Sequence, residues 1–209
     1  MAIELNIASK QGLREALEFQ MRIFDFSYDF EQDELTGGES QLEHVMNPSL
    51  EEIYYYCKYV IITGRMEKEI PILCLIYLDR FTKKTGILIN YSNWKRLTLI
   101  TLIIASKIWD DDSLENVHFP QVMSDITLKE ISGLEQVFLR LLDFDLVIRG
   151  AEYAKFYFVL KTFSKNFNSV LPMGPLSIDQ MQNLQNNTAK AELQLREKYT
   201  RKLQLEMTI

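Results

Sequence analysis

Catalysis requires side chains that can act as nucleophiles, acids or bases, and this sequence offers few of them in a recognisable arrangement. Its two histidines, His44 and His118, stand far apart in the chain, and we interpret both as structural or surface residues. The sequence contains no glycine-rich phosphate loop, no Gly-x-Ser-x-Gly and no His-Glu-x-x-His motif. These observations favour a protein that binds over an enzyme, and we expect no cofactor or resident metal.

A run of three aspartates, Asp110 to Asp112, is the densest group of carboxylates in the second half of the chain. Carboxylate oxygens bind hard cations such as Ca²⁺. However, three consecutive residues at the end of a predicted helix cannot all point at one ion. We therefore interpret the run as a solvated turn or as a charge partner for a basic protein.

Glu135 and Lys107 are the two charged residues whose positions are most unusual. Glu135 lies in the apolar stripe of a predicted helix, in line with Ile131 and Phe138, and Lys107 ends the most apolar segment of the chain. A carboxylate in such a stripe is costly unless it is paired or placed at an interface. Either the two side chains form a buried or edge salt bridge, or both project into a site where a partner docks.

The elements that must position these residues are predicted to be helices throughout. Apolar residues recur at three- and four-residue spacing, and no convincing strand pattern is present. Capping-box pairs mark three helix starts: Ser49 with Glu52, Thr127 with Glu130, and Ser177 with Gln180. We expect helices over 50–64, 69–83, 93–110, 119–124, 127–142 and 151–163, with a possible one over 13–24. A polar helix from 177 onward is either docked on the surface or partly frayed.

The helix over 93–110 has almost no polar face at its middle, so other helices must enclose it. The fold class expected is therefore all-α, with this helix at the centre. A chain of 209 residues fits one domain with extensions better than two full domains.

The charge of the chain is concentrated in its first part. The formal net charge is −6, and residues 1–47 hold ten Asp or Glu against three Lys or Arg. So acidic a chain lacks the cationic surface that binds a phosphate backbone, which makes nucleic acid an unexpected partner.

The apolar runs fall well short of the ~20 residues that span a bilayer, so no membrane insertion is expected. Ala2 argues against N-myristoylation, and two cysteines favour an intracellular, cytoplasmic or nuclear, setting.

Three runs of sequence resemble helices of a cyclin box in the order in which that fold uses them. Residues 76–81 (IYLDRF) resemble the second box helix, residues 102–107 (LIIASK) the third and central one, and residues 134–146 (LEQVFLRLLDFDL) the fifth with its exit. Further runs at 92–96, 105–111 and 152–158 are most similar to the cyclin Y branch of the family. The resemblance implies an acidic N-terminal extension over 1–47, a five-helix cyclin box over 48–146 and a C-terminal helical extension over 147–209.

The resemblance also implies a function and a set of contact residues. Cyclins bind and activate cyclin-dependent protein kinases, and the kinases of cyclin Y relatives are of the PCTAIRE/PFTAIRE type. The lysine of the Ala-Ser-Lys motif and a glutamate of the fifth helix contact the kinase in this family, and they match Lys107 and Glu135. The same comparison implies Ile104, Leu139, Phe144 and Leu146 as apolar kinase contacts, and Asp110 as a partner for a kinase arginine. The alternatives are a cyclin-fold scaffold and a module that binds transcription machinery, neither activating a kinase.

Overall fold

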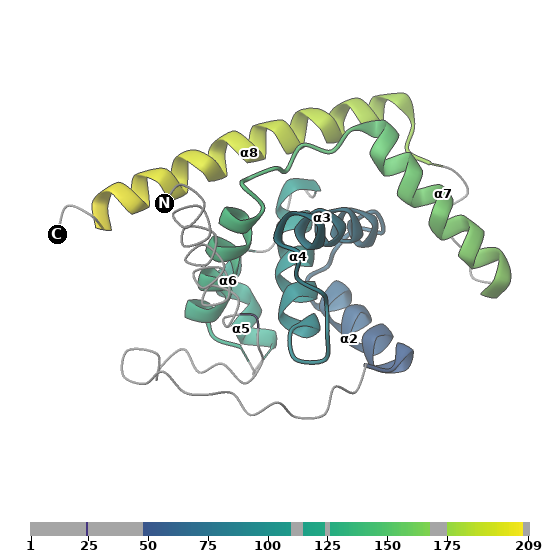
Figure 1. The fold of residues 1–209 in the computed structure, drawn as a ribbon, viewed down its shortest axis with the longest axis horizontal. Helices are drawn as coiled ribbons and strands as arrows, with labels where there is room; N and C mark the ends of the chain where they lie inside the picture. The colour runs from purple at the N-terminus through teal and green to yellow at the C-terminus, as the bar shows by residue number, and fades with distance from the viewer. Residues whose placement is uncertain (1–23, 25–47, 110–114, 124–125, 168–174, 207–209) are drawn as a thin grey trace, which may run out of the picture.

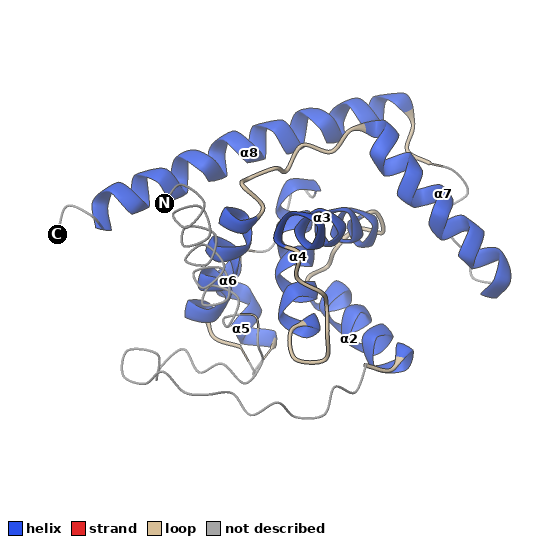
Figure 2. Ribbon diagram, viewed as in Figure 1, coloured by secondary structure: helices blue, strands red, loops and turns tan. Residues whose placement is uncertain are grey.

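The protein is helical throughout the part that the computed structural model describes, namely residues 24, 48–109, 115–123, 126–167 and 175–206 (Figures 1 and 2). The expected all-α class is confirmed. The elements are α2 (Leu50–Thr63), α3 (Ile70–Thr85), α4 (Trp94–Trp109), the 3₁₀ turn η1 (Asn116–His118), α5 (Phe119–Val122), α6 (Leu128–Leu141), α7 (Gly150–Phe167) and α8 (Ile178–Glu206). The possible helix over 13–24 lies outside the described residues, apart from its last position.

Side-chain caps fix the helix ends where the sequence predicts them. The Thr127 hydroxyl accepts a hydrogen bond from the Glu130 amide, and the Glu130 carboxylate accepts one from the Thr127 amide, so α6 begins with a complete capping box. Ser177 and Gln180 make the same reciprocal pair at α8. At the other end of α3, Gly86 has a φ of 73°, a left-handed conformation that glycine adopts without a steric penalty.

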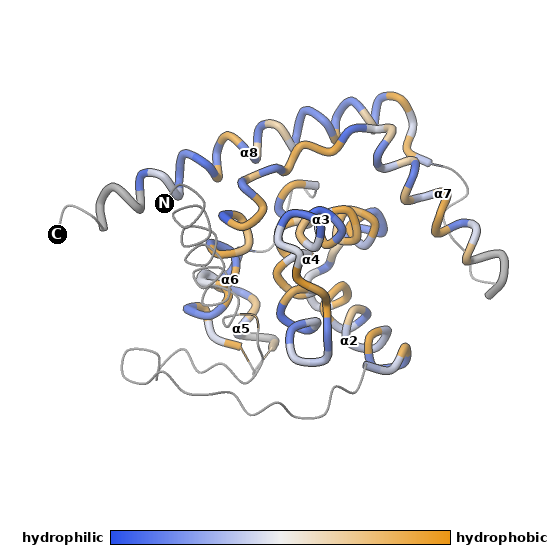
Figure 3. The backbone as a smooth tube through the Cα atoms, viewed as in Figure 1, coloured by the Kyte–Doolittle hydropathy of each residue, from blue (hydrophilic) through white to orange (hydrophobic). Residues whose placement is uncertain are grey.

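Helix α4 is the centre of the domain, as its apolar sequence predicts. It packs against α2, α3, α6 and α8, and hydropathy colouring shows it among the most apolar segments (Figure 3). Eleven of its sixteen residues are buried. Even Thr101 is fully buried, where its hydroxyl donates to the Leu97 carbonyl and so leaves no unpaired donor.

An aromatic cluster joins α3 and α6 to the N-terminal part of the chain. Phe81 of α3 and Phe138 of α6 stack with ring centroids 5.0 Å apart. The ring of Phe24 packs edge-on against both, at 5.8 and 6.4 Å, and is fully buried. Phe24 is therefore part of the domain core, although it belongs to the segment that the charge pattern sets apart.

The last two helices extend beyond this bundle. Helix α7 packs against α3 through the buried Tyr153 and Tyr157, and its C-terminal end projects outward; α8 runs back along one side of the molecule until it passes α6 (Figure 1). With 29 residues, α8 is ~43 Å long. The two helices approach closely at Gly150, where a Cβ atom would lie 2.8 Å from the Met181 sulfur. Of the two alternatives for the polar tail, the docked helix is the one observed.

Candidate functional site

Glu135 and Lys107, the two residues singled out by sequence, meet between α4 and α6. The Lys107 Nζ donates to Glu135 Oε1 at 2.6 Å. The second carboxylate oxygen of Glu135 accepts a hydrogen bond from Asn116 Nδ2 at 2.7 Å. The Glu135 side chain is 1% exposed and that of Lys107 is 21% exposed. The carboxylate is thus buried and fully paired, while part of the lysine still reaches solvent.

A tyrosine from the far end of α8 also reaches this ion pair. Tyr199 is almost completely buried. Burial raises the pKa of its hydroxyl above the usual range, and the negative charge of Glu135 and a hydrogen bond to it raise that pKa further. Three donors, from Lys107, Asn116 and Tyr199, therefore converge on one carboxylate.

Most of the apolar residues that the cyclin resemblance implies as contacts are buried. Ile104, Leu139 and Leu146 each have 1% or less of their surface exposed. Phe144 is only partly buried; its ring lies 6.3 Å from that of Tyr199, and the Arg196 guanidinium lies 5.3 Å from its centroid. Asp110 lies outside the described residues. In this structure, the apolar side chains of this set lie in the core or partly in it, and little of their surface is open to a partner.

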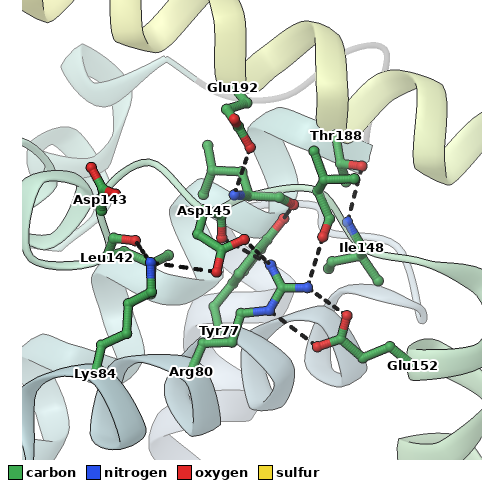
Figure 4. Close-up of polar contacts among 12 residues, drawn as sticks. Tyr77, Arg80, Lys84, Leu142, Asp143, Asp145, Ile148, Glu152, Thr188 and Glu192 are labelled. Carbon is green, nitrogen blue, oxygen red and sulfur yellow. Dashed lines mark hydrogen bonds and ion pairs between the residues drawn. The ribbon is translucent and has the colours of Figure 1, made fainter.

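The segment 142–149, which leads from α6 to α7, is held by hydrogen bonds from two sides (Figure 4). On the α3 side, the Tyr77 hydroxyl donates to the Leu146 carbonyl at 2.8 Å. Arg80 donates to the carbonyls of Asp145 and Val147 at 2.8 and 2.7 Å, and also pairs with the Glu152 carboxylate. Burial disfavours the charged form of Arg80, but Glu152 and Asp145 outweigh it, so the pKa of the guanidinium is raised.

Helix α8 holds the other side of the same segment. Its Glu192 carboxylate accepts from the Leu146 amide at 3.1 Å, and its Thr188 hydroxyl accepts from the Ile148 amide at 3.2 Å (Figure 4). Arg196 donates to the Asp143 carbonyl at 2.8 Å. Together, the two sides satisfy the main chain of a segment that has no helix or sheet partner of its own.

Residues 143 and 144 adopt an unusual backbone conformation within this segment. Asp143 and Phe144 have φ values of 54° and 53°, in the left-handed region that bulky residues seldom occupy. Such conformations persist only where the surroundings impose them, and they are concentrated at functional sites. The turn places Phe144 beside Tyr199, the tyrosine that interacts with Glu135.

Sequence reasoning did not assign roles to Asn116, Arg80, Tyr199 or the polar residues of α8. A signal for α8 was present, since Leu184, Thr188, Leu195 and Tyr199 follow helical spacing along one face. Because this stripe contains the polar Thr188 and is surrounded by charged residues, the sequence does not distinguish this face of α8 from a solvent-exposed one. The charged groups of the arrangement that are named above are each paired with a partner of opposite charge or with a hydrogen-bond acceptor.

Comparison with protein families matches the chain to the cyclin domain over residues 27–146. The chain belongs to the cyclin family. Cyclins as a family are regulatory, non-catalytic proteins. The match contains α2 to α6 and ends at Leu146, so α7 and α8 lie beyond it. It begins at residue 27, within the acidic segment.

None of the helices that the structure describes combines the length and the apolar character that a bilayer span requires.

Proposed function

We propose that this cyclin is the regulatory subunit of a cyclin-dependent protein kinase, and that the Lys107–Glu135 pair marks the surface that the kinase meets. The support comes from the pair itself: the two residues that match the family's kinase contacts lie 2.6 Å apart, between the central helix and α6. The similarity of several sequence runs to cyclin Y makes a kinase of the PCTAIRE/PFTAIRE type the first candidate partner.

The proposed mechanism is conformational. An active kinase needs an ion pair between its catalytic lysine and a glutamate on its regulatory helix. A cyclin that packs against this helix favours the arrangement in which the pair is formed, because a ligand shifts a two-state equilibrium only through stronger contacts with one state. In this protein the partly exposed Lys107 ammonium and the Phe144 ring are the groups best placed to make those contacts.

The experiment compares the wild-type chain with Lys107→Ala in binding to, and activation of, a purified PCTAIRE-type kinase. We expect Lys107→Ala to weaken binding about tenfold or more, because a central charged contact is lost. Lys83→Ala is the matched control: Lys83 makes an ion pair of the same length with Asp79, but at an exposed site on α3. Equal binding by all three proteins would reject the proposed surface.

The acidic residues 1–47 are proposed to act as a docking arm for basic kinase surface. Deleting them would remove Phe24 from the core, so the sharper test replaces carboxylates by amides at Asp29, Glu31, Asp33 and Glu34 in the full chain. We expect weaker kinase binding and a smaller dependence on salt, since salt screens the attraction between opposite charges over a Debye length of ~10 Å at 0.1 M. Unchanged affinity and unchanged salt dependence would reject this role.

A second candidate, a cyclin-fold scaffold that activates no kinase, is favoured by the burial of Glu135, Ile104 and Leu139. In this view the ion pair is purely structural. The same assay separates the two functions, because a scaffold leaves kinase activity unchanged at any concentration.

A further inference from the structure

Helix α8 is bound to the domain in two different ways along its length. Its first half is anchored by packing: Leu184 and Thr188 are fully buried, and Met181 fits against the glycine at position 150. This half lies outside the family match but completes the apolar layer beside the segment 142–149. We regard it as a fixed part of the fold.

In the second half of α8, from Leu195 to Glu206, the side chains that the structure describes, up to residue 201, make fewer and more polar contacts. Arg196 hydrogen-bonds the Asp143 carbonyl and lies over the Phe144 ring, yet its side chain remains 47% exposed. Tyr199 is the one side chain in residues 195–201 that is buried. Exposed polar contacts compete with water and contribute little to binding, so this half is held much less firmly than the first.

Arg196 and Tyr199, in the second half of α8, contact residues that the proposed function assigns to kinase binding. Tyr199 bonds to Glu135 and lies beside Phe144, and the Arg196 guanidinium also lies over that ring. Ile104 lies on α4, which also packs against α8. With 1% of its surface exposed and three donors around it, Glu135 cannot touch a second protein in this arrangement.

Two observations indicate that docking the second half of α8 over Glu135 and Phe144 leaves nearby groups in unfavourable states. Asn116 Oδ1 and Arg140 Nε are buried but have no hydrogen-bond partner among the described residues, and both side chains adjoin the surroundings of Glu135 or Tyr199. Unpaired buried polar atoms are destabilising. The left-handed backbone at Asp143 and Phe144 adds to this cost.

We infer that the second half of α8 is a reversible cover over the partner-binding surface, and that a kinase must displace Tyr199 to reach Glu135 and the full Phe144 ring. The inference rests on the proposed function for the identity of the partner, but the cover itself is a property of the free chain. Its release exposes the pair while the first half of α8 stays anchored through Leu184 and Thr188.

The free chain can be tested without any kinase, by amide hydrogen exchange of the full-length protein. We expect amides of residues 195–206 to exchange about a hundredfold faster than those of α4 and α6, with residues 181–190 intermediate or slow. Protection of residues 195–206 equal to that of α4 would show that α8 opens only with global unfolding, and would overturn the inference.

Binding to the kinase gives the second measurement. Tyr199→Ala removes the group that covers Glu135, so we expect it to bind the PCTAIRE-type kinase about tenfold more tightly than wild type. Arg196→Ala is expected to act in the same direction but by about threefold. Leu193→Ala, at an exposed position of the same helix, is the matched control and should leave the affinity unchanged.

The outcomes separate this inference from the proposed function. Weaker binding by both Tyr199→Ala and Arg196→Ala, with α4 protection retained, would mean that α8 forms part of the binding surface and would overturn the cover. If no variant binds the kinase, the proposed function fails, while the exchange rates of the free chain still decide whether α8 opens.

Discussion

The two sides of the segment 142–149 are held by the same kinds of atoms but in very different surroundings. On the α3 side, Tyr77 is fully buried and the Arg80 side chain is 13% exposed. On the α8 side, Arg196 is nearly half exposed, and beyond Thr188 only Tyr199 is buried among the side chains described. A hydrogen bond contributes more, and its loss costs more, where water cannot replace it. The α3 side therefore fixes the segment, whereas the second half of α8, which holds it through the exposed Arg196, can yield.

The largest effect is expected from Arg80→Ala. It removes a guanidinium that bonds two carbonyls and a carboxylate, and it leaves those acceptors unpaired in a mostly buried site. We expect the free energy of unfolding to fall by about 3 kcal/mol, measured by urea denaturation. Arg201→Ala, which breaks an exposed pair with Glu197, is the control. If Arg80→Ala and Arg201→Ala were equally stable, the α3 side would not hold the segment 142–149 more firmly than an exposed ion pair does.

A smaller loss is expected from Thr188→Val, at the anchored half of α8. Valine keeps the volume of the side chain but cannot accept the Ile148 amide, so a buried N–H loses its partner. The expected cost is about 1–2 kcal/mol. Thr162→Val on α7 provides the reference, since that hydroxyl donates to a carbonyl at an exposed site. If both valine variants unfold like wild type, the first half of α8 is not an anchor.

Alkaline pH should weaken the contact of Tyr199 with the domain. Burial and Glu135 raise the pKa of this hydroxyl above the value of about 10 that it has when unfolded. A group whose pKa is raised on folding contributes stability that is complete below the unfolded pKa and is lost as the pH rises towards the folded one. The contribution of Tyr199 to the unfolding free energy should therefore be constant from pH 7 to 9 and decline above about pH 10.

Tyr199→Phe tests the origin of this decline. It should cost about 1 kcal/mol at neutral pH and make the decline shallower. The decline should not vanish, because burial also raises the pKa of Tyr77 and of Tyr153. An identical pH profile for wild type and Tyr199→Phe would contradict the assignment.

The smallest effect on stability is expected from Arg196→Ala. Its ion pair with Asp143 is long and exposed, so its removal should change the unfolding free energy by about 0.5 kcal/mol. Amide exchange of residues 195–206 should nevertheless become faster, because the loss is local. A stability loss as large as that of Arg80→Ala would show that the two sides of the segment are equivalent.

Much of the fold could be predicted because it is encoded locally. The caps at Thr127 and Ser177 and the apolar length of α4 are properties of short stretches of sequence, and the structure confirms them. The pairing of Lys107 with Glu135 could be foreseen because a carboxylate in an apolar stripe requires a partner.

The cover could not be predicted because it depends on contacts between distant parts of the chain. Tyr199 meets Glu135 across more than sixty residues, and no local pattern records that meeting. Phe24 was missed for the same reason, since its place between Phe81 and Phe138 arises only in the folded core. Polar residues such as Thr188 also disguised the buried face of α8.

The most direct test of the kinase-binding surface is affinity purification of the full chain from its native cell, in parallel with Lys107→Ala and Lys83→Ala. The account predicts that a cyclin-dependent kinase co-purifies with the wild type and with Lys83→Ala, and is strongly depleted with Lys107→Ala. Recovery of the same amount of kinase with all three proteins, or of no kinase with any of them, would contradict it.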